Sequence, residues 1–417
     1  MSSKSNDIIS IIHPICCGLD VHKKNISACL ITVDEFGKEE YHLKEFATFT
    51  DDLYKLKEWL IEHECPIVAI ESTGVYWRPV HNVLEDVVKV VLVNAGHAKN
   101  LPGKKTDISD SKWLAGLIRC GLVKGSFIPE KEVRQWRELT RLRKSYTKSV
   151  GDYKRRVHKL FECANIKISA VASDLFGVTG RNLIDLLCHK ENELTLDDVK
   201  SCAKGALRKQ VEELYRSING FFEEHHRFQL ILLMDTITML ETRIVEITAR
   251  LSKVMTAHDD LIERLDDIPG INILAAQTII SETGVDLDKF PSHASLASWG
   301  GLCPGNNETG GKRKSGKTAI HNHPFKTILI EVSWAAIKKK GSYFKDKYYR
   351  LRARRGSKKA IVAIAHKISK AIYYIIKFGR TFNELGEDYL NKKNESKKLK
   401  RLQQEANKMG YALVAVN

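Results

Sequence analysis

Four acidic residues near the start of the chain have the types and the spacing that metal-dependent chemistry requires. Asp20 ends the apolar run ICCGLD, and Glu71 ends a second apolar run, CPIVAIE. Asp107 and Asp110 lie close together in TDISDSKW, where a helical pattern begins, so that one helix face would carry both. Converging carboxylates repel one another unless cations lie between them, and a pair of Mg²⁺ ions suits phosphoryl transfer. The four acids therefore predict a magnesium site, although an acidic pair is also an ordinary helix start.

The segments around these acids alternate between strand and helix patterns. The turn DVHKKN is short enough for a hairpin, so the sheet would begin antiparallel and continue with helix-linked parallel strands. That order, with acids at the strand ends, is typical of a ribonuclease-H-like α/β fold. Strand patterns occupy 15–21, 26–33, 41–48, 66–71 and 88–94, and helical patterns occupy 51–63, 76–86 and 107–121.

The composition limits the class of protein and its partners. A chain of 417 residues suggests about three domains, and 43% hydrophobic with 28% charged residues is typical of a soluble globular protein. A net charge of +16 favours a polyanionic partner, above all nucleic acid, over a merely solvated basic surface. The nine scattered cysteines include no C-x-x-C pair, which argues against a zinc site or a disulfide framework. With no membrane-length apolar run and no signal-peptide pattern, we expect a cytoplasmic protein without a membrane partner.

The middle of the chain, from about 130 to 256, is helical in pattern and lacks proline. Its second apolar series alternates steps of four and three, which is a heptad seam. Two long helices around an insert predict a coiled-coil hairpin, whose seam would make a dimer contact or an internal bundle; we favour the dimer. The apolar series are Leu139, Leu142, Tyr146, Val150, Tyr153, Val157 and Leu160, then Leu233, Ile237, Leu240, Ile244, Ile247, Leu251 and Val254.

A third region begins near 259 with two helical patterns joined by the turn IPGI. This resembles a helix-hairpin-helix element, whose turn amides bind phosphate, although such turns also occur as plain connections. The glycine-rich segment WGGLCPGNNETGGKRKSGKT then predicts a flexible, cationic loop that approaches a phosphate backbone; its spacing does not match a P-loop. A basic helix start near 343 adds arginines among Tyr343, Tyr348 and Tyr349, either for nucleic acid or as a solvated face. The candidate nucleic-acid contacts are Lys312, Arg313, Lys314, Lys317, Arg350, Arg352, Arg354 and Arg355.

Several segments, in this order and at suitable distances, carry a resemblance to a known family. They are GLDVHKKNISACLI, IESTGVYWRPV, NAGHAKNLPGKKTDISDSKWLAGLIRCGLVKGSFIP, RELTRLRKSYT, IPGINILAAQTIISE and WGGLCPGNNETGGKRKSGKT. Together they resemble the insertion-sequence-one-ten family of transposases, in its eleven-eleven branch, which is related to the Piv DNA invertase. The resemblance extends to about residue 380.

The resemblance implies a fold and a set of catalytic residues. The N-terminal domain would be RuvC-like, with Asp20, Glu71, Asp107 and Asp110 as DEDD acids that hold Mg²⁺, here expected as two ions. A C-terminal transposase domain, mainly helical, would carry a nucleophilic hydroxyl. We expect a catalytic domain at 1–128, a coiled-coil dimerisation region at 129–258, the transposase domain at 259–385 and a basic tail at 386–417.

The resemblance also implies partners. Family members are recombinases guided by a structured non-coding RNA, called bridge RNA or seekRNA, that pairs with both donor and target DNA. They act as tetramers made of two homodimers. Each composite active site combines the RuvC-like domain of one subunit with the transposase domain of another.

The chain departs from the family pattern at two places. Thr309 stands where the family usually has serine, and IHNHP around Asn322 replaces the usual Lys-x-Gly-Asn. We predict Thr309 as the nucleophile because threonine carries the same hydroxyl, although its methyl group crowds the attack path. Ser315 is the rival nucleophile, and Thr309 would otherwise be a loop residue that satisfies a turn amide.

Two other functions compete with the transposase reading. One is a plain RuvC-like metal nuclease, such as a junction resolvase, in which water attacks and no protein–DNA bond forms. The other is a catalytically impaired relative that only binds nucleic acid.

Overall fold

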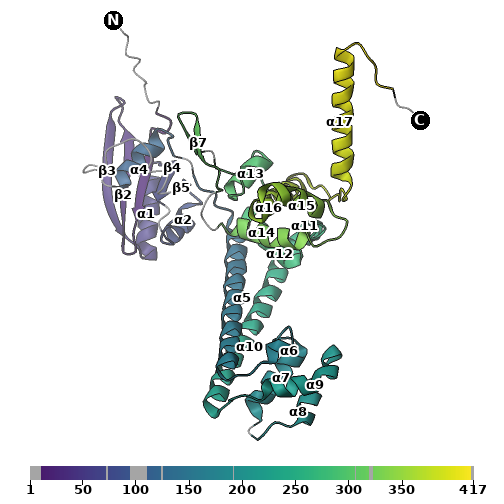
Figure 1. The fold of residues 1–417 in the computed structure, drawn as a ribbon. Helices are drawn as coiled ribbons and strands as arrows, with labels where there is room; N and C mark the ends of the chain where they lie inside the picture. Colours follow the sequence, from purple (N-terminus) through teal and green to yellow (C-terminus); the bar gives the residue numbers. More distant parts are fainter. Residues whose placement is uncertain are drawn as a thin grey trace. The chain divides into compact units, whose positions relative to one another are not determined.

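The computed structural model of this chain divides into two compact units, residues 1–128 and 129–417 (Figure 1). Two positions singled out from the sequence, Asp107 and Asn322, lie outside the described residues. The structure describes residues 11–71, 74–93, 110–123, 125–190, 192–305, 307–318 and 323–414.

The first unit is built on a five-stranded sheet in the order β3-β2-β1-β4-β5. β1, β2 and β3 pair antiparallel, whereas β4 and β5 run parallel to β1, which confirms the predicted mixed sheet. The strands are β1 (Cys16–Val21), β2 (Asn25–Val33), β3 (Glu39–Ala47), β4 (Ile67–Glu71) and β5 (Lys89–Val93).

Helices cover both faces of this sheet. α1 (Thr50–Glu62) and α2 (Trp77–Leu84) pack on the face that carries Cys17 and Leu19. α4 (Asp110–Arg119) packs on the opposite face, against Cys16 and Ala69. The central strands β1, β2 and β4 are apolar on both faces because both of their faces are buried, whereas the edge strand β3 is mostly polar and exposed.

Cys16 and Cys17 are buried on opposite faces of β1, as expected of core residues. Burial raises the pKa of the Cys16 thiol to about 12 and raises the pKa of Cys17 well above its usual value. Both side chains are therefore neutral packing groups rather than reactive thiolates.

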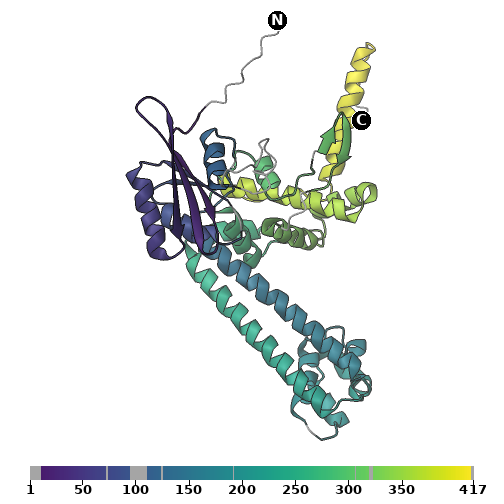
Figure 2. The same cartoon turned by 90° about the vertical axis from the view of Figure 1, so that its left-hand side faces the viewer.

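The second unit contains two long helices, α5 (Lys131–Cys163) and α10 (Glu224–Val254), that lie along one another within the chain (Figure 2). Val150 and Val157 of α5 share one buried cluster with Ile237 and Leu240 of α10. Both predicted apolar series thus contribute to an internal core. A coiled coil between subunits stays a prediction.

The segment between the long helices is itself helical and completes the same core. It comprises α6 (Ile168–Val171), α7 (Val178–His189), α8 (Leu196–Cys202), η1 (Gly205–Gln210) and α9 (Val211–Ile218).

The rest of the second unit is mainly helical and gathers around α16, which contacts α11, α13, α14 and α15. The predicted turn IPGI joins α11 to α12, and a Cβ on Gly270 would lie 2.4 Å from the carbonyl oxygen of Val332 in α14. The helices are α11 (Asp259–Asp266), α12 (Ile273–Thr283), α13 (His293–Trp299), α14 (Pro324–Ala336), α15 (Tyr343–Arg355), α16 (Ser357–Phe378) and α17 (Tyr389–Lys408), preceded by η2 (Thr256–His258).

A polar clamp fixes α12 on α5. The Arg141 guanidinium donates two hydrogen bonds of 2.9 Å to the carboxylate of Glu282, whose side chain is only 1% exposed. Arg137 donates to the backbone oxygens of Ser281 and Glu282. These arginines belong to the segment RELTRLRKSYT, so its positive charge serves an internal contact at these positions.

Throughout the described ranges, no helix is long and apolar enough to cross a membrane.

Candidate active site

Two of the predicted catalytic acids lie at the ends of adjacent parallel strands. The β1–β4 register pairs Leu19 with Ile70, so Asp20 and Glu71 follow at the next position of each strand. Because paired residues of neighbouring strands share a face, both acids lie on the sheet face that α4 covers. The Asp20 side chain is 19% exposed and Glu71 is half-buried.

The third described acid, Asp110, is the first residue of α4. α4 approaches β1 so closely that a Cβ on Gly18 would lie 2.1 Å from the carbonyl oxygen of Ser111. One turn further along α4, the Ala115 carbonyl accepts a hydrogen bond from the Cys16 thiol at 3.5 Å. α4 therefore runs antiparallel to β1, and its first turn lies toward the end of β1 that carries Asp20.

These contacts bring Asp20, Glu71 and Asp110 to one corner of the first unit. Asp107 lies outside the described residues, in the segment that leads into α4. The donor set consists of carboxylate oxygens, which are the ligands that Mg²⁺ prefers.

The structure adds His22, which the sequence argument did not single out. Its Nε2 atom lies 3.2 Å from Oδ2 of Asp20. The two-residue spacing in DVH was the available signal, since it places both side chains on one face of an extended chain.

Within the predicted glycine-rich cationic loop, residues 307–315 form a β-hairpin, which the sequence argument did not foresee. β6 (Asn307–Thr309) pairs antiparallel with β7 (Lys312–Ser315). The turn between them is Gly310-Gly311, with φ of 56° and 74°. Positive φ at both central positions is the requirement of a type I′ turn, and glycine meets it without strain.

The two candidate nucleophiles occupy different ends of this hairpin. Thr309 pairs with Lys312 and directly precedes the turn, whereas Ser315 pairs with Asn307 at the open end. Below the hairpin, the Gly305 amide donates to the Lys317 carbonyl at 2.9 Å, which continues the pairing of the two chain segments. The backbone thus places Thr309 at the tip.

The predicted basic residues of α15 differ in their surroundings. Arg350 donates two hydrogen bonds of 2.8 Å to Asp346 and a third to Asn391, so its guanidinium serves an internal contact. Arg352, Arg354 and Arg355 are exposed. Lys317 is also exposed, beyond the hairpin.

The tyrosines near these arginines also divide into two kinds. Tyr348 is buried, and its hydroxyl lies 2.9 Å from that of Ser357, so it is a core residue. Tyr349 is 51% exposed, and the Arg352 guanidinium lies 6.0 Å from its ring centroid.

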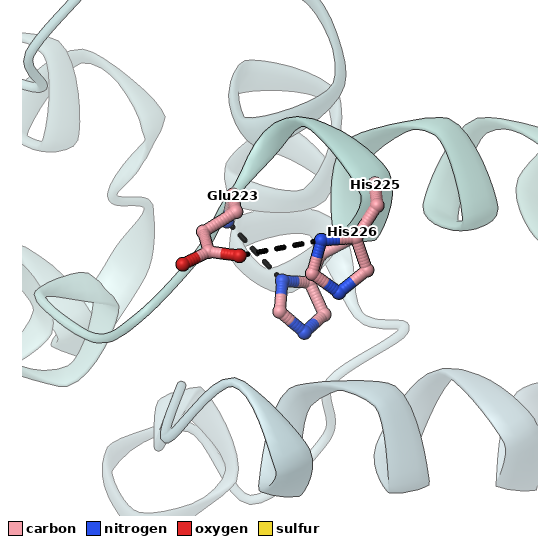
Figure 3. A group of neighbouring side chains, drawn as sticks. All are labelled: Glu223, His225 and His226. Atoms are coloured by element: carbon pink, nitrogen blue, oxygen red, sulfur yellow. Dashed lines mark hydrogen bonds and ion pairs between the residues drawn. The ribbon is translucent and has the colours of Figure 1, made fainter.

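Among the described residues, the side chains whose ligand atoms already lie together as in a metal site are not the predicted catalytic acids but a group in the second unit. Ligand atoms of Glu223, His225 and His226, at the start of α10, lie within 4.8 Å of one another (Figure 3). His226 Nδ1 accepts a hydrogen bond from the Glu223 amide, and the Glu223 side chain accepts one from the His226 amide. This reciprocal capping box accounts for the cluster as the start of a helix.

Two models of known protein families match parts of this chain. Residues 17–165 match the family model described as "Transposase", for DEDD transposases of the IS110 type. Residues 262–349 match the model described as "Transposase IS116/IS110/IS902 family". The chain belongs to the IS110 family of transposases. The first IS110 match includes Asp20, Glu71 and Asp110, and the second includes the hairpin with Thr309.

A curated relative agrees with this assignment over a shorter range. It is a "Probable family 20 transposase" of Pseudomonas aeruginosa, 31% identical over 110 residues. The match covers 25% of this chain and 31% of the relative, so the chain spans less than a third of that protein's length. Membership of a DEDD transposase family indicates use of a divalent metal.

Proposed function

We propose that this protein is the transposase of an insertion sequence and that it cuts and rejoins DNA. The observation that carries the proposal is the placement of Asp20 and Glu71 at adjacent strand ends, on the sheet face where α4 begins with Asp110. In this proposal residues 1–128 form the RuvC-like catalytic domain, and residues 259–385 form the transposase domain that carries the nucleophile.

The acids at this corner suit two Mg²⁺ ions. Asp20, Glu71, Asp110 and, from the sequence, Asp107 would hold them, because hard cations prefer carboxylate oxygens. Bound there, the ions would supply positive charge next to the scissile phosphate and its leaving oxygen. We assign His22 a positioning role, in which its contact at 3.2 Å would favour one orientation of the Asp20 carboxylate.

Thr309 is the proposed nucleophile. Its hydroxyl would give up its proton as its oxygen bonds to phosphorus, while the bond from phosphorus to one sugar oxygen breaks and that oxygen takes up a proton. Attack by the hydroxyl of a second DNA end would then release Thr309 and rejoin the strands. The position of Thr309 at the hairpin tip, next to exposed glycines, supports this role because a phosphate can approach such a turn closely.

The proposed partners are donor DNA, target DNA and a bridge RNA that pairs with both. The net charge of +16 and the exposed Arg352, Arg354 and Arg355 support polyanionic partners.

We further propose a homodimer that assembles into a tetramer. Phe228, Leu232 and Met239 support it, because these half-exposed apolar side chains recur along one face of α10. A second subunit would cover this stripe.

The test is a reconstituted cleavage assay with the full chain, synthetic bridge RNA and DNA that carries the element's ends. We expect Mg²⁺-dependent cleavage that Asp20→Ala abolishes. Asp51→Ala, which removes an exposed carboxylate from the same unit, should cleave normally. Cleavage by Asp20→Ala at the wild-type rate would refute the metal site. Undiminished recombination without RNA would refute the role of the bridge RNA.

The nucleophile is tested in the same assay by mass spectrometry of the trapped protein–DNA adduct. We expect the adduct on Thr309, its loss in Thr309→Ala and its recovery in Thr309→Ser. An adduct on Ser315 would transfer the role to that residue. Cleavage without any adduct would favour a RuvC-like nuclease that uses water.

A further inference from the structure

The end of α16 carries a group of aromatic and basic side chains that the catalytic proposal does not use. The rings of Tyr374 and Phe378 are stacked, with centroids 5.8 Å apart and planes inclined by 28°. The Arg380 guanidinium lies 5.2 Å from the first ring centroid and 5.6 Å from the second. The Lys370 ammonium lies 5.8 Å from the Tyr374 centroid. We call Lys370, Tyr374, Phe378 and Arg380 the basic–aromatic platform.

The platform faces solvent, unlike the neighbouring aromatic residue. Phe378 is 55% exposed, Arg380 is exposed, and Lys370 and Tyr374 are half-buried. Tyr373, by contrast, is 4% exposed and donates a hydrogen bond from its hydroxyl to the Phe290 carbonyl. α16 therefore uses one aromatic residue for the core and presents the next ones on its surface.

Positive charge is concentrated beside the platform. His293 of α13 lies with its ring centroid 6.0 Å from that of Tyr374. Burial, followed by the charges of Lys370 and Lys367, lowers the pKa of His293. Burial and neighbouring lysines, Lys370 first among them, also lower the pKa of Lys367. The charge of Lys367, which Lys370 destabilises, would be stabilised by a bound anion, whereas the lowered pKa of His293 favours its neutral form.

Helix capping does not account for Arg380. The carbonyl of Gly379, at the end of α16, already accepts a hydrogen bond from Arg264 at 3.2 Å. Arg380 instead lies against the rings of Tyr374 and Phe378, and the Phe378 ring remains largely exposed to solvent. A cation beside an exposed pair of stacked rings matches the two needs of a nucleotide, which are a surface for its base and a charge for its phosphate.

We propose that the basic–aromatic platform binds an unpaired nucleotide of a nucleic-acid strand. The base would stack on the exposed ring of Phe378, which Tyr374 supports from behind, and Arg380 and Lys370 would hold the adjacent phosphate. The inference rests on the proposed function in taking nucleic acid as the ligand, and it adds that the strand is single at this point. Stacking tolerates any base, so the platform would bind without sequence preference.

The test is fluorescence anisotropy of the full chain with labelled oligonucleotides of mixed sequence, as single strands and as duplexes, in DNA and RNA forms. The background variant is Asp20→Ala, so that no cleavage is needed and failure of the proposed function does not affect the readout. We expect Phe378→Ala and Arg380→Ala each to weaken single-strand binding by about tenfold, with duplex binding changed less than twofold. Phe378→Trp should restore binding, since it keeps a flat ring.

Matched controls separate the platform from general loss of charge or apolar surface. Lys339→Ala removes one exposed cation from the same unit, and Phe221→Ala removes a ring that is 75% exposed. Both should bind as the background variant does. If the platform variants lose more affinity for single-stranded RNA than for single-stranded DNA, or the reverse, the nucleic acid with the larger loss is the one that the platform binds. The proposal would be overturned if Phe378→Ala and Arg380→Ala left single-strand affinity unchanged, or weakened single-strand and duplex binding equally. It would also be overturned if affinity fell only in variants whose melting temperature had fallen.

Discussion

Substituting alanine for Gly18 tests how the catalytic corner is built. A Cβ at this position would lie 2.1 Å from the carbonyl oxygen of Ser111 and 2.4 Å from the amide nitrogen of Ala115. Both atoms belong to the backbone of α4, so no side-chain rotation relieves the contact. We expect Gly18→Ala to push α4 away from β1.

The size of the effect follows from these distances. Carbon and carbonyl oxygen approach to roughly 3.3 Å, so α4 must move by about 1 Å. Overpacking of this kind costs up to about 3 kcal/mol. In a unit of this size that corresponds to roughly 10 °C in melting temperature. Moving Asp110 by about 1 Å relative to Asp20 should also slow cleavage by roughly 100-fold.

Gly116 supplies the matched control, because it lies on the same helix and a Cβ there would meet nothing within 4 Å. Gly116→Ala should stabilise α4 by about 0.5–1 kcal/mol and leave cleavage intact. Thermal melting and hydrogen exchange of the β1 and α4 peptides would measure stability, and the reconstituted assay would measure cleavage. Wild-type melting and cleavage by Gly18→Ala would refute the close approach of α4 to β1.

Three further predictions concern stability and pH. Glu282→Ala leaves the Arg141 guanidinium without its carboxylate, so it should cost about 3 kcal/mol in urea unfolding and raise hydrogen exchange in α12; unchanged exchange there would count against the clamp. Ile237→Ala, at a fully buried position, should cost about 2–4 kcal/mol, and a cost below about 1 kcal/mol would mean that α10 does not pack on α5 as described. Hydrogen bonds from Lys190 and Thr195 lower the pKa of Asp198 to about 2 from 3.8, so its stabilising effect is present above pH 4 and is lost as the pH falls toward 2. The difference in melting temperature between wild type and Asp198→Asn should therefore shrink over that range, and a constant difference would contradict this account.

Local patterns predicted the sheet because each strand depends on its own apolar run and its own turn. The two acids at strand ends were found in the same way, since Asp20 and Glu71 close such runs. The approach of α4 to β1 was not predictable by these means. Gly18 and Ser111 are far apart in the chain, and only the folded sheet shows why a side chain cannot fit at Gly18.

Other misses have equally specific causes. The glycine-rich segment was predicted as a flexible loop, and the argument did not foresee that its Gly310-Gly311 pair supplies the two positive φ angles of a tight hairpin turn. Charge alone marked Arg350 as a nucleic-acid contact, although Asp346, four residues earlier on α15, pairs with it. The two apolar series identified both long helices but could not specify their partner, because the same apolar spacing serves pairing within a chain and between chains.

The central claim is that Asp20, Glu71 and Asp110 belong to one divalent-metal site, and an anomalous difference map from crystals soaked in Mn²⁺ tests it most directly. The account predicts peaks about 2.1 Å from carboxylate oxygens of Asp20 and Glu71, absent from crystals of Asp20→Ala. Peaks that persist in Asp20→Ala, or Mn²⁺ bound only at Glu223, His225 and His226, would contradict it.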